Sequence, residues 1–154
     1  MEEIALKKRL LSLLCVLFVL SISCVSYADN GHELPWGKDF STFKNLTFSH
    51  ESGDVKYYTV NDEKVCEITK VAATKVTYAF KGGKLYARIV NILDSADLEK
   101  LHNHFSDSFG KSKVSTQDGW NVHKWVKGDV KIKLKEDVEE TVHKLGMYYT
   151  PLAS

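Results

Sequence analysis

Apolar and polar positions alternate in two blocks of the chain, and each block predicts a pair of antiparallel strands. In the first block, residues 75–80 and 84–90 flank Gly82-Gly83, and a Gly-Gly loop supplies the positive φ values of a tight hairpin turn. Because side chains alternate between the two faces of a strand, this turn collects apolar residues on a single face. The expected cross-strand pairs are Phe80 with Leu85, Tyr78 with Ala87, and Val76 with Ile89.

The second block consists of residues 120–126 and 130–134, which flank Lys127-Gly128-Asp129 and predict another hairpin. The pairs expected here are Trp125 with Ile132 and His123 with Leu134. Lysines at 131, 133 and 135 alternate with apolar residues, which is typical of a sheet with one face in water. Residues 55–60 and 142–149 predict two further strands, because both are rich in β-branched and aromatic side chains.

One amphipathic helix is predicted between the two blocks, from Ala96 to Phe109. Its apolar residues recur at spacings of three and four and form one stripe: Leu98, Leu101, Phe105 and Phe109. Asp94 or Ser95 is expected to cap the first turn, and Gly110 to end the helix. A shorter helix of one or two turns is predicted after Asp39.

These elements predict an α+β fold, an antiparallel β-sheet with the main helix (about 96–109) packed on one face. The order of helix then strands, met twice, indicates two degenerate helix-plus-strands units. Trp36-Gly37 stands before the first helix, Phe109-Gly110 closes the second, and strands with Trp120, Trp125 and Ile132-Lys133-Leu134 follow. In this pattern the chain resembles small exported bacterial domains of the β-lactamase inhibitor protein type and of the SmpA/OmlA lipoprotein type. The resemblance implies tandem helix-plus-sheet units in an exported protein.

The first 28 residues have the pattern of a removable secretory signal peptide, which leaves 29–154 as a single α+β domain. A basic stretch at 7–9 precedes an almost purely apolar run at 10–22, and Ser26-Tyr27-Ala28 supplies a small-x-small cleavage pattern. The apolar run is shorter than the ~20 residues that span a bilayer core, so no transmembrane segment is expected in the mature form. Two alternatives stay open: a retained N-terminal anchor helix, or a lipid anchor on Cys24.

The net charge limits the class of partner, and the cysteine content indicates the compartment. Removal of residues 1–28 takes three basic side chains from 21 and two acidic ones from 20, and leaves 18 of each. A net charge of zero argues against a nucleic-acid partner, which usually meets a clear basic excess. Cys66 is then the one cysteine left, so no intrachain disulfide can form and the fold must be stabilised by its hydrophobic core. For an exported domain, this favours the bacterial periplasm.

No constellation in the sequence has the specificity of a catalytic or cofactor motif. There is no Gly-x-Ser-x-Gly elbow, no Cys–His signature and no phosphate-binding glycine loop, so we assign no catalytic residue and no cofactor, and do not expect an enzyme. His102 and His104 point about 200° apart on a helix, which is unsuitable for a metal pair. His123 and His143 are predicted to face inward from neighbouring strands. We favour two histidines hydrogen-bonded at the rim of the core; a metal or hydrolytic site using both is the alternative.

Aromatic residues give the strongest lead to a binding surface. Two pairs of adjacent tyrosines lie in predicted strands, and each pair sends one ring to each face, so one ring of each pair is expected to be partly exposed. Exposed Tyr and Trp are common anchors of protein and ligand surfaces. The sequence predicts an exported periplasmic binding or protein-interaction module, with a protein or small ligand as partner; a structural cell-envelope component is a further alternative. The candidate binding residues are Tyr57, Tyr58, Trp120, Tyr148 and Tyr149.

Overall fold

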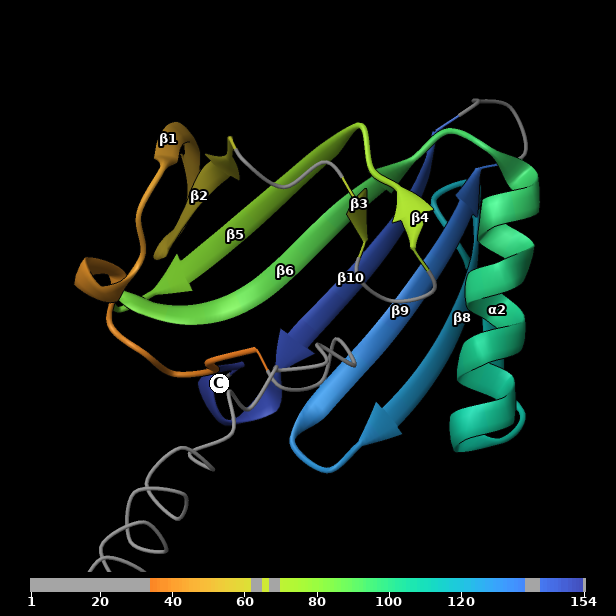
Figure 1. Ribbon diagram of the computed structural model, residues 1–154. Helices are drawn as coiled ribbons and strands as arrows, with labels where there is room; N and C mark the ends of the chain where they lie inside the picture. The colour runs from red at the N-terminus through yellow and green to blue at the C-terminus, as the bar shows by residue number, and fades with distance from the viewer. Residues whose placement is uncertain (1–33, 62–64, 67–69, 138–141, 154) are drawn as a thin grey trace, which may run out of the picture.

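The computed structural model describes residues 34–61, 65–66, 70–137 and 142–153. The predicted signal peptide and Cys24 lie outside these residues. The described chain forms an eight-stranded antiparallel sheet, a small two-stranded sheet, one α-helix and two 3-10 turns (Figure 1). In chain order these are η1 (Phe40–Thr42), β1 (Leu46–Ser52), β2 (Val55–Val60), β3 (Val65–Cys66), β4 (Val71–Ala72), β5 (Lys75–Lys81), β6 (Lys84–Ile92), α2 (Ser95–Phe109), β7 (Lys113–Gln117), β8 (Trp120–Lys127), β9 (Val130–Asp137), β10 (His143–Tyr149) and η2 (Thr150–Leu152).

The large sheet joins an N-terminal and a C-terminal group of four strands. Its strand order is β1-β2-β5-β6-β10-β9-β8-β7, so β6 and β10 meet at the centre. Helix α2 carries the chain from β6 to the far edge, and β7 to β10 then return to the middle strand by strand. The helix packs on one face of the sheet, against β8, β9 and β6. The predicted α+β architecture is therefore confirmed.

The main helix begins one residue before the predicted start and ends at Phe109 as predicted, and three of the four residues of the predicted stripe are buried while Phe109 is half-buried. It begins after Asp94, whose carboxylate accepts a hydrogen bond of 2.7 Å from the Ala96 backbone N–H, and it ends at Gly110 with a φ of 80°. The buried residues of the helix are Leu98, Leu101 and Phe105. Trp125 reaches across from β8 and donates its indole N–H to the Gly110 carbonyl at 2.9 Å, which ties the helix end to the sheet.

Both hairpins form, and the second has the predicted register, with Trp125 opposite Ile132 and His123 opposite Leu134. In the first hairpin Gly82 and Gly83 take φ values of 57° and 75°, as the turn requires. Phe80 lies opposite Leu85 as predicted. The next pairs differ from the prediction.

The register of the first hairpin shifts by one residue between Ala79 and Phe80. Two residues of β6 then oppose one of β5, which is a β-bulge, and every later side chain of β6 turns to the other face. Val76 therefore lies opposite Val90, not Ile89, and Tyr78 lies opposite Arg88, not Ala87. As a result the side chain of Arg88 is fully buried on the helix side of the sheet.

The short helix predicted after Asp39 is only the three-residue 3-10 turn η1, and the Asp39 side chain makes no capping hydrogen bond. The segment is held instead by a backbone bridge between Asp39 and Lys84 at the hairpin turn. Phe40 packs on Phe80 with ring centroids 5.1 Å apart. Of the two predicted helix-plus-strands units, the first therefore has a turn with aromatic packing where an α-helix was expected.

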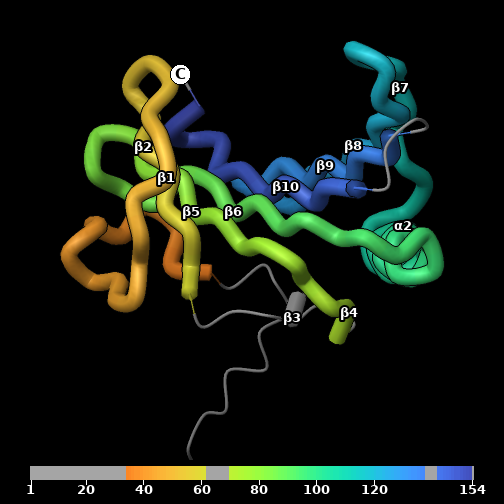
Figure 2. The backbone as a smooth tube through the Cα atoms, turned by 90° about the horizontal axis from the view of Figure 1, so that it is seen from above, coloured from red at the N-terminus to blue at the C-terminus, as the bar shows by residue number. Residues whose placement is uncertain are grey.

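One side of the large sheet, which we call the inner face, is covered by most of the elements outside the sheet, while the C-terminal turn η2 lies on the other side beside the β1–β2 hairpin (Figure 2). Figure 2 shows α2, the β3–β4 hairpin and the N-terminal segment from Leu34 to Phe43 on this side. The other side is the outer face, and the sheet curves toward it at both edges, at the β1–β2 hairpin and at β7 (Figure 2). Within the described residues, no helix has the length and apolar character needed to cross a membrane.

Candidate functional site

Lysine side chains gather on the outer face of the C-terminal strands. Residues paired directly across neighbouring strands share a face, so the register places Lys113, Lys124 and Lys133 in one row across β7, β8 and β9. Lys135 of β9 and Lys144 of β10 are likewise paired directly. We call the set the lysine cluster; it consists of Lys113, Lys124, Lys131, Lys133, Lys135 and Lys144.

The lysine cluster is electrostatically unfavourable in the free protein. Burial lowers the pKa of Lys133, and the charges of Lys135, Lys131 and Lys124 lower it further. Three ion pairs, Lys56 with Glu51, Lys81 with Asp54 and Lys100 with Asp97, lie away from this cluster, and the carboxylate of Asp137, the residue opposite Trp120, lies at its margin. Like charges directly opposite each other destabilise a sheet, so this arrangement is better suited to binding an anion than to stabilising the fold.

Aromatic rings lie among these ammonium groups. The Nζ atoms of Lys144 and Lys135 lie 4.9 Å and 5.9 Å from the ring centroid of Trp120. The Lys133 Nζ lies 5.2 Å from the centroid of Tyr148. Each ring is half-buried, and a cation over a ring face is attracted to it. The rings therefore help to hold the lysines in place on the outer face.

The position of Tyr148 depends on the glycine two residues before it. A Cβ at Gly146 would lie only 2.6 Å from the Tyr148 hydroxyl oxygen and 2.7 Å from its Cε2 atom, so the ring lies down over the bare glycine backbone. Burial raises the pKa of Tyr148, and the nearby phenols of Tyr86 and Tyr57 raise it further. These tyrosines extend the aromatic surface from β10 across β6 toward β2.

The structure divides the five predicted binding residues between the two faces. Tyr57, Trp120 and Tyr148 lie on the outer face, and Tyr57 stacks on His50 at 4.4 Å between centroids. Tyr58 lies on the inner face, where its ring packs 5.6 Å from that of Phe80. Tyr149 also lies on the inner side and stacks on Trp36. Each tyrosine pair does send one ring to each face.

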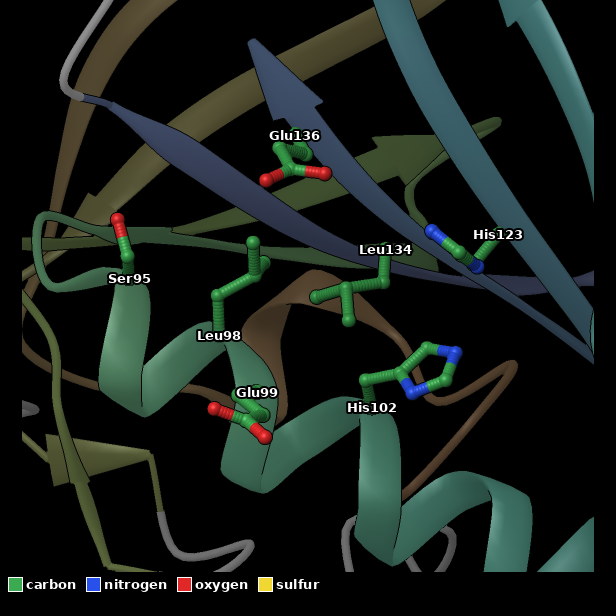
Figure 3. Close-up of a pocket in the computed structure, with 7 residues that line it drawn as sticks. All are labelled: Ser95, Leu98, Glu99, His102, His123, Leu134 and Glu136. Atoms are coloured by element: carbon green, nitrogen blue, oxygen red, sulfur yellow. The ribbon is translucent and has the colours of Figure 1, made fainter. Parts of the chain in front are cut away.

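A cavity of about 330 Å³ lies on the inner face, between α2 and strands β8 and β9 (Figure 3). The residues that line it are Ser95, Leu98, Glu99, His102, His123, Leu134 and Glu136. Figure 3 shows His102 and His123 on facing walls of helix and sheet, and their ring centroids are 4.6 Å apart. Leu98 and Leu134 form the apolar floor, so carboxylates, imidazoles and a hydroxyl share one small hollow.

His123 and His143 both lie on the inner face, but the prediction that they come from neighbouring strands is wrong, because β9 lies between β8 and β10. Burial lowers the pKa of His123, and the charge of His102 lowers it further, while its Nδ1 lies 3.1 Å from the Ser112 hydroxyl. His143 is 4% exposed and does not line the cavity, but its Nε2 lies 3.3 Å from the hydroxyl of Ser95, which does. In the part of the chain described, no group of three or more His, Cys, Asp or Glu side chains could hold a metal ion.

Sequence reasoning missed both the lysine cluster and the acidic walls of the cavity. The alternation of Lys131, Lys133 and Lys135 was visible, but it was interpreted only as a solvated face. The balanced net charge concealed the segregation of lysines, because Lys113, Lys124 and Lys144 join the set only through strand pairing. A net charge of zero is therefore compatible with a strongly basic surface on the outer face.

Comparison with protein-family models, with curated proteins and with solved structures found no match. The function has to be argued from the geometry alone.

Proposed function

We propose that this chain is an exported binding module of the bacterial periplasm, and that it binds an anionic ligand through the outer face of its sheet. The observation that carries the proposal is the lysine cluster, which four neighbouring strands build together. Neighbouring strands of a sheet lie about 4.8 Å apart, so the positive charges of the three lysines in one row are closely spaced. An anion placed over the row would relieve their mutual repulsion.

Two further observations support the outer face as the binding surface. The helix, the β3–β4 hairpin and the N-terminal segment all cover the inner face (Figure 2). The lysines are held beside Trp120 and Tyr148, which offer apolar ring surface next to the charges. Binding sites commonly combine charged groups, which attract the ligand, with aromatic side chains, which supply much of the binding energy.

Calorimetric titration with inorganic polyphosphate tests the anion-binding role. Binding should weaken steeply between about 50 and 200 mM salt, because it depends on contacts between lysines and anions. The K124Q/K133Q double variant should reduce the slope of log affinity against log salt by about 2, one for each lost contact. The matched control K44Q/K111Q removes two exposed lysines from elsewhere and should leave the slope unchanged. Equal losses in the two variants, or no binding by the wild type, would refute the proposal.

Export is tested separately, by mass spectrometry of the protein recovered from the periplasm of an expressing bacterium. A mature chain beginning at Asp29 is the expected result, because the small-x-small pattern ends at Ala28. A chain that keeps Met1 or begins with a modified Cys24 would replace this part of the proposal with one of the two anchored forms.

A second candidate function is hydrolysis at the inner cavity. The observation that favours it is the 3.3 Å approach of the Ser95 hydroxyl to Nε2 of His143, which is the arrangement of a nucleophile and its base. Incubation with a panel of simple esters tests it. Turnover that is lost in S95A and kept in S112A would establish the site, whereas turnover that survives in S95A would exclude it.

A further inference from the structure

We infer that the ligand of the outer face is an acidic polysaccharide, a glycan whose sugar units carry carboxylate groups. The inference rests on the proposed function and adds the chemical class of the ligand. It follows from three features of the outer face: the direction of the lysine rows, the position of the aromatic rings, and the polar residues that continue the rows.

The lysine rows run across the strands and match a linear polyanion. Lys113, Lys124 and Lys133 occupy equivalent positions on three adjacent strands, so their Cα atoms follow a line perpendicular to the strands. Lys135 and Lys144 begin a second, parallel line one pair further along. A ligand with one anionic group would use few of these lysines. A chain with repeated anionic groups, lying across the strands, would meet them in succession.

The aromatic rings favour sugar units as the repeating part of that chain. Trp120 lies within 6 Å of both Lys135 and Lys144, and Tyr148 is equally close to Lys133. At each of these places a ring and an ammonium group therefore lie together, and the ammonium group has to move off the ring face for a sugar to stack on it. A uronic acid unit has the complementary pair, since the C–H face of its ring packs on an aromatic ring while its carboxylate accepts from the Lys Nζ.

Hydroxyl and amide groups continue the same rows beyond the lysines. The row of Lys133 passes through Gly146 and Ile89 to Thr77 and Thr59. The row of Lys144 passes to Asn91. These short polar side chains pair well with the hydroxyl groups of a glycan. A polyphosphate, which carries acceptor oxygens only, has no donor for the oxygen atoms of these side chains.

The shape of the outer face excludes a flat membrane surface as the occupant. The sheet curves toward this side at both edges (Figure 2), so a planar array of lipid headgroups would meet the β1–β2 hairpin and β7 before it met the lysines of β8, β9 and β10. An extended chain can lie between the edges. Nucleic acid is the other chain that combines anions with stackable rings, and it is one outcome of the test.

The test compares four polymers in calorimetric titrations of the purified protein at one low salt concentration. The probes are polygalacturonate, poly-L-glutamate, oligo-deoxythymidylate and neutral dextran. We expect polygalacturonate to bind at least about ten-fold more tightly than the others. Its sugar faces can pack on the aromatic rings in addition to the contacts between its carboxylates and the lysines, and such aromatic contacts often dominate a binding energy. Trp120→Leu should remove this advantage and leave poly-L-glutamate binding unchanged. Trp36→Leu is the control, because Trp36 packs on Tyr149 on the inner side.

The outcomes separate this inference from the proposed function. Equal affinity for polygalacturonate and poly-L-glutamate, both lost in K124Q/K133Q, would overturn the glycan assignment and leave anion binding in place. Tighter binding of oligo-deoxythymidylate would overturn it in favour of nucleic acid. If none of the three polyanions bound, the proposed function itself would fail. Thermal unfolding of each variant shows whether a loss of binding reflects a loss of fold, and Tyr148→Leu then serves as the second ring variant.

Discussion

Replacement of Gly146 by alanine should destabilise the protein through one neighbour, the ring of Tyr148. The added Cβ would lie 2.6 Å from the tyrosine oxygen and 2.7 Å from a ring carbon, so the ring has to lift off the sheet. Inserting one carbon into such a contact costs about 1–3 kcal/mol. In a Tyr148→Ala background the ring is gone, and the same Gly→Ala change should instead stabilise the strand by about 0.5–1 kcal/mol.

A double-mutant cycle measures the difference between these two effects. The four proteins are the wild type, G146A, Y148A and G146A/Y148A, and urea unfolding followed by tryptophan fluorescence gives the free energy of unfolding of each. The opposite signs predict a coupling energy of about 1.5–4 kcal/mol, well above the ~0.5 kcal/mol scatter of independent sites. Unchanged m-values would show that the denatured state is the same throughout.

The cycle refutes the reasoning if G146A has the same effect with and without the Tyr148 ring. Such a result would mean that the backbone of β10, and not the ring above it, requires glycine at this position. A further consequence is functional, because a displaced ring no longer faces Lys133. G146A should therefore weaken anion binding in the polyphosphate titration as well.

Three other predictions concern the helix and its cavity. The pKa of His123 is lowered in the folded state, so the free energy of unfolding should be highest above about pH 6.5 and should decrease as the pH falls below that value. Urea unfolding at several pH values measures this dependence, which should be weaker in H123Q. Leu101→Ala should cost about 2–5 kcal/mol of unfolding free energy, while Leu93→Ala at an exposed site should cost under about 0.5 kcal/mol; similar costs would contradict the helix packing. Asp94→Ala should cost about 0.5–2 kcal/mol and speed amide exchange in the first helical turn; unchanged exchange would show that the cap contributes nothing.

Local signals in the sequence predicted the elements well, because each element depends on residues close together in the chain. Gly82-Gly83 sets the first hairpin turn, and the stripe of Leu98, Leu101 and Phe105 sets the buried side of the helix. Within the first hairpin the prediction of register was wrong, because a bulge beside Tyr86 has no clear sequence signal. That single extra residue decides whether Arg88 faces water or the core.

The candidate site could be predicted only in part, because it depends on which strands become neighbours. Strand alternation singled out the tyrosine pairs that contain Tyr57 and Tyr148, and Trp120 was predicted as one of the aromatic residues. The alternating lysines of β9 follow the same strand pattern. Lys113 and Lys144 are 31 positions apart in the chain and share a surface only through the pairing of β7 to β10. Non-local pairing of this kind leaves no local trace in one sequence.

The strand order also has a consequence for biosynthesis. Among the described strands β10 is the last to leave the ribosome, yet it lies between β6 and β9 and supplies the hydrogen bonds on both sides of the middle of the sheet. Until that final segment emerges, the chain is two separate half-sheets with open edges, and neither can close on the other. A sheet built in this order is completed only when β10, its central C-terminal strand, has been synthesised and inserted between β6 and β9.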